Sequence, residues 1–347
     1  MLTVLEKHER DAVAVLPAEV HAFFASGAGD EVTLAEATEA WARFRLRPRV
    51  LRDVSAVDLT TTLLGSTFAH PVGIAPVGYQ GLAHPDSENA VAGAAHDQGA
   101  LLVASTRAST PLEEIGASAQ GPWWFQVYVM RNRDLTLRLV ERAAAAGARA
   151  LVLTGDTPYV GIKRRVGAAR IAIPDETFLV NLARHVTGEA SAARAEAEQV
   201  ASVTLDAIGW LADVSGLPVL VKGVLRADDA LACLDAGAAG IVVSNHGGRQ
   251  LDRSLPSALA LAEVVDAVAG RGPVLVDGGI RSGLDVLVAL ALGASAVLIG
   301  RPVVWGLTTG GQAGVAEVLG ALRDDLTHVM ALAGAASVGD LDRSLVH

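Results

Sequence analysis

Eight short, continuous apolar runs recur along the chain and constrain its fold more than any other feature. Continuous rather than alternating hydrophobicity predicts strands that are buried on both faces, as in a parallel sheet. The segments between the runs, such as 134–146, 227–236 and 283–292, have helical composition. Alternating strands and helices predict an α/β fold. The runs are VGIA (72–75), LLVA (101–104), WFQVY (124–128), ALVLT (150–154), PVLVK (218–222), GIVVS (240–244), PVLVD (273–277) and AVLIG (296–300).

A small internal repeat favours one of the possible α/β architectures. The pair Gly-Ala occurs at 99–100, 147–148, 237–238 and 293–294, each time just before a predicted strand. Glycine there suits the left-handed position that ends a helix. Eight strands with repeated helix-to-strand joints predict a closed (β/α)8 TIM barrel. The alternative is a doubly wound open sheet, but no G-x-G-x-x-G follows the first strand.

The length of 347 residues suits one barrel domain with extra segments as well as two domains. We expect a single domain over 1–347. Residues 1–70 form an N-terminal extension with a helical segment. Residues 157–217, after the fourth strand, are too long for one helix and predict a lid over the active site.

Composition excludes several classes of protein. With 51% hydrophobic residues the chain is not disordered. A single cysteine, Cys233, excludes a disulfide framework and a cysteine zinc site, and we expect no metal. The net charge of −10 argues against nucleic-acid binding. The first fifteen residues lack a signal-peptide core, and the apolar stretch 286–300 is too short to span a membrane. We therefore expect a cytoplasmic protein without a membrane partner.

The predicted strand ends are unusually polar. In β/α barrels the working residues sit at the carboxyl ends of the strands. Capping of strand ends would explain polar residues at one or two strands, but polar residues follow all eight, which predicts a functional site. These are Pro76-Val77-Gly78, Ser105-Thr106, Gln126 with Tyr128, Thr154 with Asp156, Lys222, Ser244-Asn245-His246, Asp277-Gly278-Gly279 and Gly300-Arg301.

The last two strands lead into a predicted phosphate site. The loops are DGGIRSG (277–283) and GRP (300–302). Glycines let backbone N–H groups approach a phosphate, and helix N-termini favour anions. Arg281 and Arg301 add positive charge.

The sixth strand ends in SNHGGRQLD (244–252). His246 is a natural proton acceptor near neutral pH. Arg249, three residues on, is suited to holding a carboxylate with two parallel hydrogen bonds. The pair predicts proton abstraction from a substrate that carries a carboxylate. A lone histidine would more simply be satisfied by loop hydrogen bonds.

These motifs carry a specific resemblance. The chain resembles the FMN-dependent 2-hydroxy-acid oxidase and dehydrogenase family, which includes glycolate oxidase, lactate oxidase, lactate monooxygenase, mandelate dehydrogenase and 4-hydroxymandelate oxidase. The similarity runs from about residue 15 to 340. Its longest segments are IAPVGYQGLAHP (74–85), LTGDTP (153–158), GIVVSNHGGRQLD (240–252), VLVDGGIRSGLDV (274–286) and ALGASAVLIGRPV (291–303).

The resemblance implies an FMN-binding barrel and roles for the matching residues. His246 would be the base, Arg249 the carboxylate clamp, and Asp156 the partner that stabilises the charged imidazole. Tyr128 would hydrogen-bond the substrate, and Lys222 would stabilise the reduced flavin. The implied flavin contacts are Pro76, Val77, Gly78, Ser105, Gln126, Thr154, Lys222 and Ser244 for the ring, and Asp277, Gly278, Gly279, Ile280, Arg281, Gly300 and Arg301 for the ribityl chain and phosphate.

Four positions depart from the family pattern. Phe23 stands where a tyrosine often touches the substrate carboxylate, which favours a larger, more apolar substrate. Lys163 stands where the lid usually supplies a second arginine, and either neighbour, Arg164 or Arg165, is an alternative. Arg107 replaces an aromatic residue and either alters the pocket mouth or meets a second polar group on the substrate. Gly78 stands where some members have alanine.

The resemblance thus implies oxidation of an (S)-2-hydroxy acid to the 2-oxo acid, with FMN reoxidised by oxygen or another acceptor. The substrate is expected to be aromatic and mandelate-like. The alternatives are a larger natural-product or peptide-derived substrate, or an FMN-dependent isomerase without net redox change. A non-catalytic flavin- or phosphate-binding protein is disfavoured by the complete set of reactive residues. The resemblance also implies a homotetramer or larger assembly.

Overall fold

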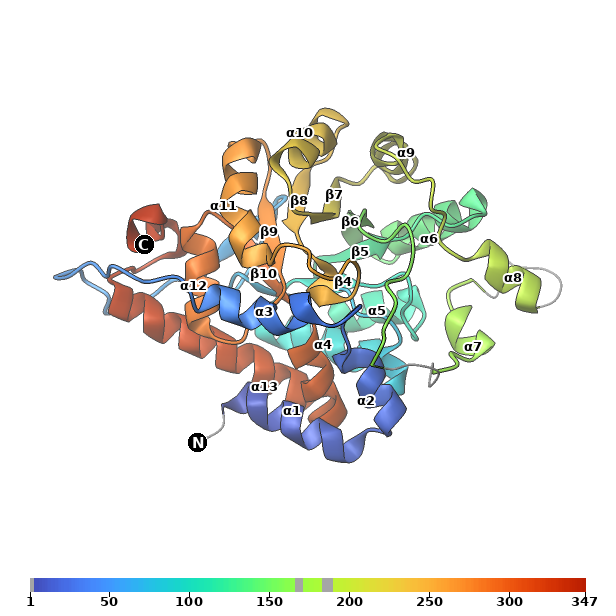
Figure 1. The fold of residues 1–347 in the computed structure, drawn as a ribbon, viewed down its shortest axis with the longest axis horizontal. Helices are drawn as coiled ribbons and strands as arrows, with labels where there is room; N and C mark the ends of the chain where they lie inside the picture. The colour runs from blue at the N-terminus through green and yellow to red at the C-terminus, as the bar shows by residue number, and fades with distance from the viewer. Residues whose placement is uncertain (1–2, 166–170, 183–189) are drawn as a thin grey trace.

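The computed structural model describes residues 3–165, 171–182 and 190–347. Its centre is a closed barrel of eight parallel strands in the order β10-β3-β4-β5-β6-β7-β8-β9 (Figure 1). This confirms the predicted (β/α)8 barrel. Each observed strand overlaps its predicted run, and the ends differ by two residues at most. The strands are β3 (Val72–Ile74), β4 (Leu102–Ala104), β5 (Trp123–Val127), β6 (Ala148–Thr154), β7 (Val219–Val224), β8 (Gly240–Val243), β9 (Val274–Asp277) and β10 (Ala296–Ile299).

Alternating residues of each strand face two different cores. In β10, Ala296 and Leu298 belong to the cluster that fills the barrel, whereas Val297 and Ile299 belong to the cluster between strands and helices. Successive side chains of a strand point to opposite faces. Because both faces are buried, the sequence is apolar throughout, which is why the runs could be recognised as strands.

Helices surround the barrel and follow the strands in turn. The glycines of the four Gly-Ala pairs all have positive φ, between 62° and 104°, and end helices as predicted. The last helix is 33 residues long and contains a non-helical residue, Gly311. The helices are α4 (Ser87–Gln98), α5 (Leu112–Ala119), α6 (Arg133–Ala145), α9 (Asp206–Ser215), α10 (Ala227–Asp235), α11 (Ser257–Val268), α12 (Gly283–Ala291) and α13 (Arg301–Ala333).

The N-terminal extension holds the predicted helical segment and two elements that were not predicted. The segment forms α2 (Ala18–Ala25) and α3 (Val32–Trp41). The first unpredicted element is α1 (Val4–Val15), which is capped by Thr3 and Glu6 and lies along α13 (Figure 1).

The second unpredicted element is the antiparallel hairpin of β1 (Thr61–Leu63) and β2 (Ser66–Phe68). Its turn residues, Leu64 and Gly65, both have positive φ, as tight two-residue hairpins require. Leu63 and Phe68 are buried in the same cluster as the side chains inside the barrel, including Trp124. The chain then enters β3, so the hairpin closes the amino-terminal end of the barrel.

The excursion after β6 is shorter than predicted. The segment 157–217 includes α9, which packs against α6 and β7 as a barrel helix does. The excursion itself carries α7 (Asp175–Phe178) and α8 (Ala190–Glu196), which lie at the edge of the molecule (Figure 1). Short 3-10 turns complete the structure, namely η1 (Gln80–Leu82), η2 (His246–Gly248), η3 (Val338–Asp340) and η4 (Arg343–Leu345).

The apolar stretch 286–300 is the end of α12 followed by β10, as predicted. Within the described ranges, none of the helices has the length and hydropathy needed to cross a membrane.

Candidate active site

A cavity of about 810 Å³ opens at the carboxyl ends of the barrel strands. Volumes of this size hold cofactors and substrates. Most of the residues predicted for the site line it. These are Phe23, Pro76, Val77, Gly78, Ser105, Arg107, Tyr128, Lys163, Lys222, His246, Arg249, Asp277, Gly278, Gly279, Ile280, Arg281, Gly300 and Arg301. The predicted residues Gln126, Thr154, Asp156, Arg164 and Ser244 are not in the lining.

Three of the predicted flavin contacts form one hydrogen-bonded row across β4, β5 and β6. The Ser105 hydroxyl donates to Gln126 Oε1 at 3.3 Å, and Gln126 Nε2 donates to Thr154 Oγ1 at 3.0 Å. All three side chains are buried. Gln126 and Thr154 therefore support Ser105, which lines the cavity itself.

Lys222 of β7 links the ends of the neighbouring strands β8 and β9. Its Nζ lies 3.0 Å from Asp277 Oδ2 and donates to Ser244 Oγ at 2.9 Å. Burial disfavours the charge, but Asp277 and Asp156 outweigh burial and raise the pKa of Lys222. Asp277 Oδ1 is buried and has no hydrogen-bond partner within the described ranges. The pair thus presents a fixed positive charge and an acceptor oxygen in need of a donor.

His246 is held by Asp156 in a partly buried pair. The Nδ1 atom lies 3.1 Å from Asp156 Oδ1. Burial lowers the pKa of His246, and Asp156 offsets only part of this effect. Burial raises the pKa of Asp156, but His246 and Lys222 more than compensate and leave it below its usual value. The result is a carboxylate beside an imidazole that is neutral near pH 7, with Nε2 as the nitrogen left to accept a proton.

Arg281 and Arg301 lie at the predicted phosphate end without carboxylate ion-pair partners in the described structure, and the charge of Arg249 lies near them. Arg301 donates through Nε, Nη1 and Nη2 to the carbonyls of Phe24, Gly247 and Ser26. Burial, together with Arg249 and Arg281, lowers the pKa of Arg301 to about 9. Burial lowers the pKa of Arg281 as well. Such a cluster favours an anion, because a bound anion relieves the repulsion between the buried cations.

Arg249 is held in place by backbone carbonyls. Its Nη1 donates to the carbonyls of Phe23, Phe24 and Ser26 at 2.9 to 3.1 Å. Burial lowers its pKa to about 10. Its guanidinium lies 5.5 Å from the Phe23 ring centre. The bonds through Nη1 orient the rest of the guanidinium, which lines the cavity.

The glycine loop after β9 is required by close packing. Gly279 has φ +80°, and a Cβ there would lie 2.1 Å from the Ala37 carbonyl oxygen. No other residue fits against α3 at this position, so the backbone of 277–279 is fixed at the cavity wall.

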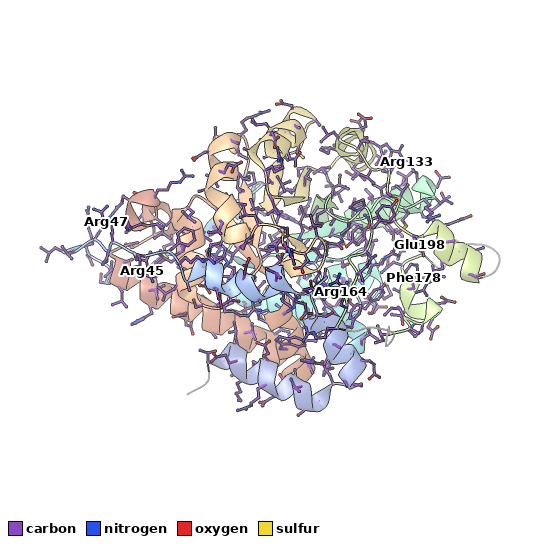
Figure 2. The ribbon with its side chains drawn as sticks, viewed as in Figure 1. Arg45, Arg47, Arg133, Arg164, Phe178 and Glu198 are labelled. Atoms are coloured by element: carbon purple, nitrogen blue, oxygen red, sulfur yellow. The ribbon has the colours of Figure 1, made fainter. Side chains whose placement is uncertain are left out.

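The lid contributes Lys163 to the cavity, and the prediction for Arg164 is corrected. Arg164 is exposed and pairs with Asp30, while Arg165 Nε lies 3.0 Å from Glu31 Oε1. Figure 2 shows Arg164 beside the α2 and α3 segment. Acidic side chains of the loop between α2 and α3 thus draw both arginines away from the cavity.

The sequence reasoning missed several lining residues. Tyr79 directly follows the predicted Gly78, has φ +59°, and its ring centre lies 6.1 Å from that of Phe23. Its position after a strand end was a usable signal. Phe178 and Glu198 line the cavity from the lid side (Figure 2), a segment without periodicity to indicate them. Gln250 accepts a hydrogen bond from the Gly161 backbone at 2.7 Å and links the lid to the His246 loop.

Comparison with known proteins agrees with this geometry. The family model for FMN-dependent dehydrogenases matches residues 12–347. The L-lactate oxidase of Nostoc sp. is 46% identical over 94% of this chain and 92% of its own. The glycolate oxidase of Spinacia oleracea is 42% identical over 99% of this chain and 95% of its own. A mandelate oxidase mutant solved with (S)-mandelic acid superposes with a TM-score of 0.91, at 42% identity over 100% of this chain and 98% of that one.

The residues present fit FMN. Arg281, Arg301 and the glycine loop suit its phosphate, and Asp277 Oδ1, which has no hydrogen-bond partner among the described residues, suits a ribityl hydroxyl. Lys222 and Ser105 line the same cavity between apolar walls. FMN is therefore the cofactor, and the chain belongs to the FMN-dependent dehydrogenase family.

Proposed function

We propose that this protein oxidises an (S)-2-hydroxy acid to the 2-oxo acid, with FMN reoxidised by oxygen or another acceptor. The observation that carries the proposal is the 3.1 Å pair of His246 and Asp156 on a cavity that Arg249 also lines. A base beside a carboxylate-binding cation is what removal of a proton from a 2-hydroxy acid requires.

The chain's own residues divide the work. His246 Nε2 takes the proton of the substrate hydroxyl, and Asp156 stabilises the imidazolium that results. Arg249 and Lys163 hold the substrate carboxylate, and Tyr128 hydrogen-bonds the substrate. Burial and Asp156 raise the pKa of Tyr128, so its phenol stays protonated and able to donate. Bound FMN would supply the acceptor for the hydrogen of the substrate C–H bond together with its two electrons, so that the hydroxyl proton alone goes to His246.

The body of the substrate meets aromatic side chains. Phe23 and Tyr79 line the cavity with their rings in contact. A phenyl group packs well against such rings. Among the similar proteins, a mandelate oxidase has been solved with (S)-mandelic acid. We infer that an aryl group is accepted at this position.

An anaerobic absorbance titration tests the proposal. The purified FMN enzyme is titrated with mandelate, 4-hydroxymandelate, lactate and glycolate, and the flavin band is followed. We expect bleaching by at least one of them, fastest with an aryl hydroxy acid. The His246→Gln variant should bind FMN and bleach about 10² to 10⁴ times more slowly. Equal rates in variant and wild type would contradict the role of His246.

We also propose that the protein is cytoplasmic and assembles into a homotetramer or larger. These two proposals rest on the sequence and on the family resemblance alone. Cell fractionation and sedimentation velocity of the FMN enzyme test them, and a monomer at micromolar concentration would contradict the second.

A further inference from the structure

Arg107 is a cation at the cavity that the proposed reaction does not use. Its Nη2 donates to the Ala197 carbonyl at 2.7 Å, and its guanidinium lies 4.2 Å from the centre of the Phe178 ring. Its Nη1 atom is buried and has no hydrogen-bond partner among the residues that the structure describes. Contacts from the lid therefore fix the guanidinium while one pair of donors stays unsatisfied.

The neighbours of Arg107 offset its charge only in part: Glu198 favours the charged form and Arg194 opposes it. No carboxylate of the described residues forms an ion pair with it. Glu198 lines the same cavity, but its carboxylate lies 3.6 Å from Arg131. Burial raises the pKa of Tyr79 and of Tyr128, so both phenols stay neutral. Burial lowers the pKa of Arg107, and a bound anion would offset that cost.

Arg107 belongs to the substrate end of the cavity rather than to the phosphate end. Tyr128 lies within electrostatic range of both Arg107 and Arg249. The Arg107 carbonyl also accepts a hydrogen bond from the Tyr79 backbone at 2.8 Å, and the Tyr79 ring contacts Phe23. A substrate held by Arg249 and packed on Phe23 therefore extends toward Arg107.

We propose that Arg107 binds a second carboxylate of the substrate, so that the preferred substrates are 2-hydroxy acids with a distal carboxylate. This inference rests on the proposed function and names its substrate class. An arginine with a free edge in a desolvated pocket suits a carboxylate better than a neutral group.

Matched substrates test the proposal. One pair is 2-hydroxyglutarate and 2-hydroxypentanoate, in which a carboxylate replaces a methyl group. The other is 4-carboxymandelate and 4-methylmandelate. The 5-amide of 2-hydroxyglutarate separates charge from hydrogen bonding. For each substrate kcat/KM is measured anaerobically from flavin bleaching, and binding of the matching 2-oxo acids is measured from the flavin spectrum.

We expect wild type to favour the dicarboxylate of each pair by about 10- to 100-fold, the value of one charge-assisted contact. The Arg107→Met variant should lose this preference, so that kcat/KM becomes equal within each pair, whereas Arg107→Lys should retain part of the preference. Arg133→Met is the matched control, because Arg133 also stacks on an aromatic ring, 4.0 Å from the centre of Trp210, but lies outside the cavity (Figure 2).

The result that overturns the proposal is equal kcat/KM within each pair in wild type, or a preference that survives in Arg107→Met. A stronger preference for the amide than for the carboxylate would also overturn it. A merely structural role of Arg107 would lower activity on both members alike and leave their ratio unchanged. If no 2-hydroxy acid bleaches the flavin, the proposed function fails instead, so the two failures are distinguishable.

Discussion

At the scale of residues, the reactivity of His246 comes from its surroundings. Burial keeps the imidazole neutral, and Asp156 at 3.1 Å keeps it ready to hold a proton. Removing the carboxylate leaves burial and Lys222 opposed only by Asp277, which lowers the pKa of His246 further. The environment thus keeps His246 neutral before the reaction and still able to hold a proton afterwards.

The pH dependence of the reaction reports this balance. Because burial holds the pKa of His246 below 6.5, the base is neutral at pH 7, and kcat/KM should fall only as pH drops below 6.5. In Asp156→Asn the acid limb should move to lower pH, while the plateau falls about 100-fold or more. The measurement is kcat/KM from pH 5 to 8. A limb that moves to higher pH would show that Asp156 does not raise the pKa of His246.

Lys163 and Arg164 give a second test at this scale. Lys163 lines the cavity and Arg164 pairs with Asp30 outside it. We expect Lys163→Met to raise KM about tenfold with a smaller effect on kcat, because a charge contact to the substrate is lost. Arg164→Met should leave KM unchanged. A larger effect of the Arg164 substitution would restore the original prediction.

The sequence predicted well which strand-end residues lie at the cavity, and predicted poorly which lid residues do. Strand ends such as Lys222 and Asp277 are positioned by the barrel, so knowing the strand places the side chain. The side on which a loop residue lies depends on what it meets. Nothing local to Arg164 reveals that Asp30, far away in the chain, binds it. The sequence alone therefore could not decide which of Lys163, Arg164 and Arg165 faces the cavity.

At the scale of elements, strand β7 makes room for the His246–Asp156 pair through a glycine. Gly223 has φ +108°, and the pairing of β7 with β8 shifts register between Lys222 and Val224. A Cβ at Gly223 would lie 2.5 Å from Asp156 Cβ. Its lack of a side chain thus leaves room for the partner of His246.

The Gly223→Ala substitution should displace Asp156 and lower kcat/KM by tenfold or more, with the acid limb shifted as in Asp156→Asn. Gly237→Ala is the control, since Gly237 has a similar φ of +96° and no atoms within 4 Å of the added Cβ. It should cost about 1 kcal/mol of stability and leave kcat/KM unchanged. Equal kinetic effects of the two substitutions would refute the positioning role.

The elements that escaped prediction are short or irregular. Strands β1 and β2 have three residues each and a Leu64-Gly65 turn without the Asn-Gly signature of tight hairpins. The barrel strands were recognisable because burial on both faces requires a continuous run of apolar residues in the sequence. The helix α9 was included in the lid because its boundary with the irregular excursion carries no strong signal.

At the scale of the whole molecule, charge is distributed unevenly. The chain has a net charge of −10, yet its cavity gathers Arg249, Arg281 and Arg301. A cleft of one sign in a molecule of the other attracts small anions specifically. Both FMN and a 2-hydroxy acid are anions, so one local field serves cofactor and substrate.

The phosphate of FMN should therefore contribute strongly to stability. We expect FMN to raise the Tm of the cofactor-free protein more than riboflavin at equal concentration, and to bind about 10- to 100-fold more tightly. In Arg301→Met this advantage should shrink, because a buried cation is lost. Scanning calorimetry with titration of both flavins measures it. Equal stabilisation by the two flavins would contradict a phosphate site at these arginines.

The hairpin at the amino-terminal end of the barrel determines where molecules can enter the cavity. With Leu63 and Phe68 sealing one end, molecules enter and leave through the mouth at the other. FMN and substrate therefore share one route between the cavity and the solvent.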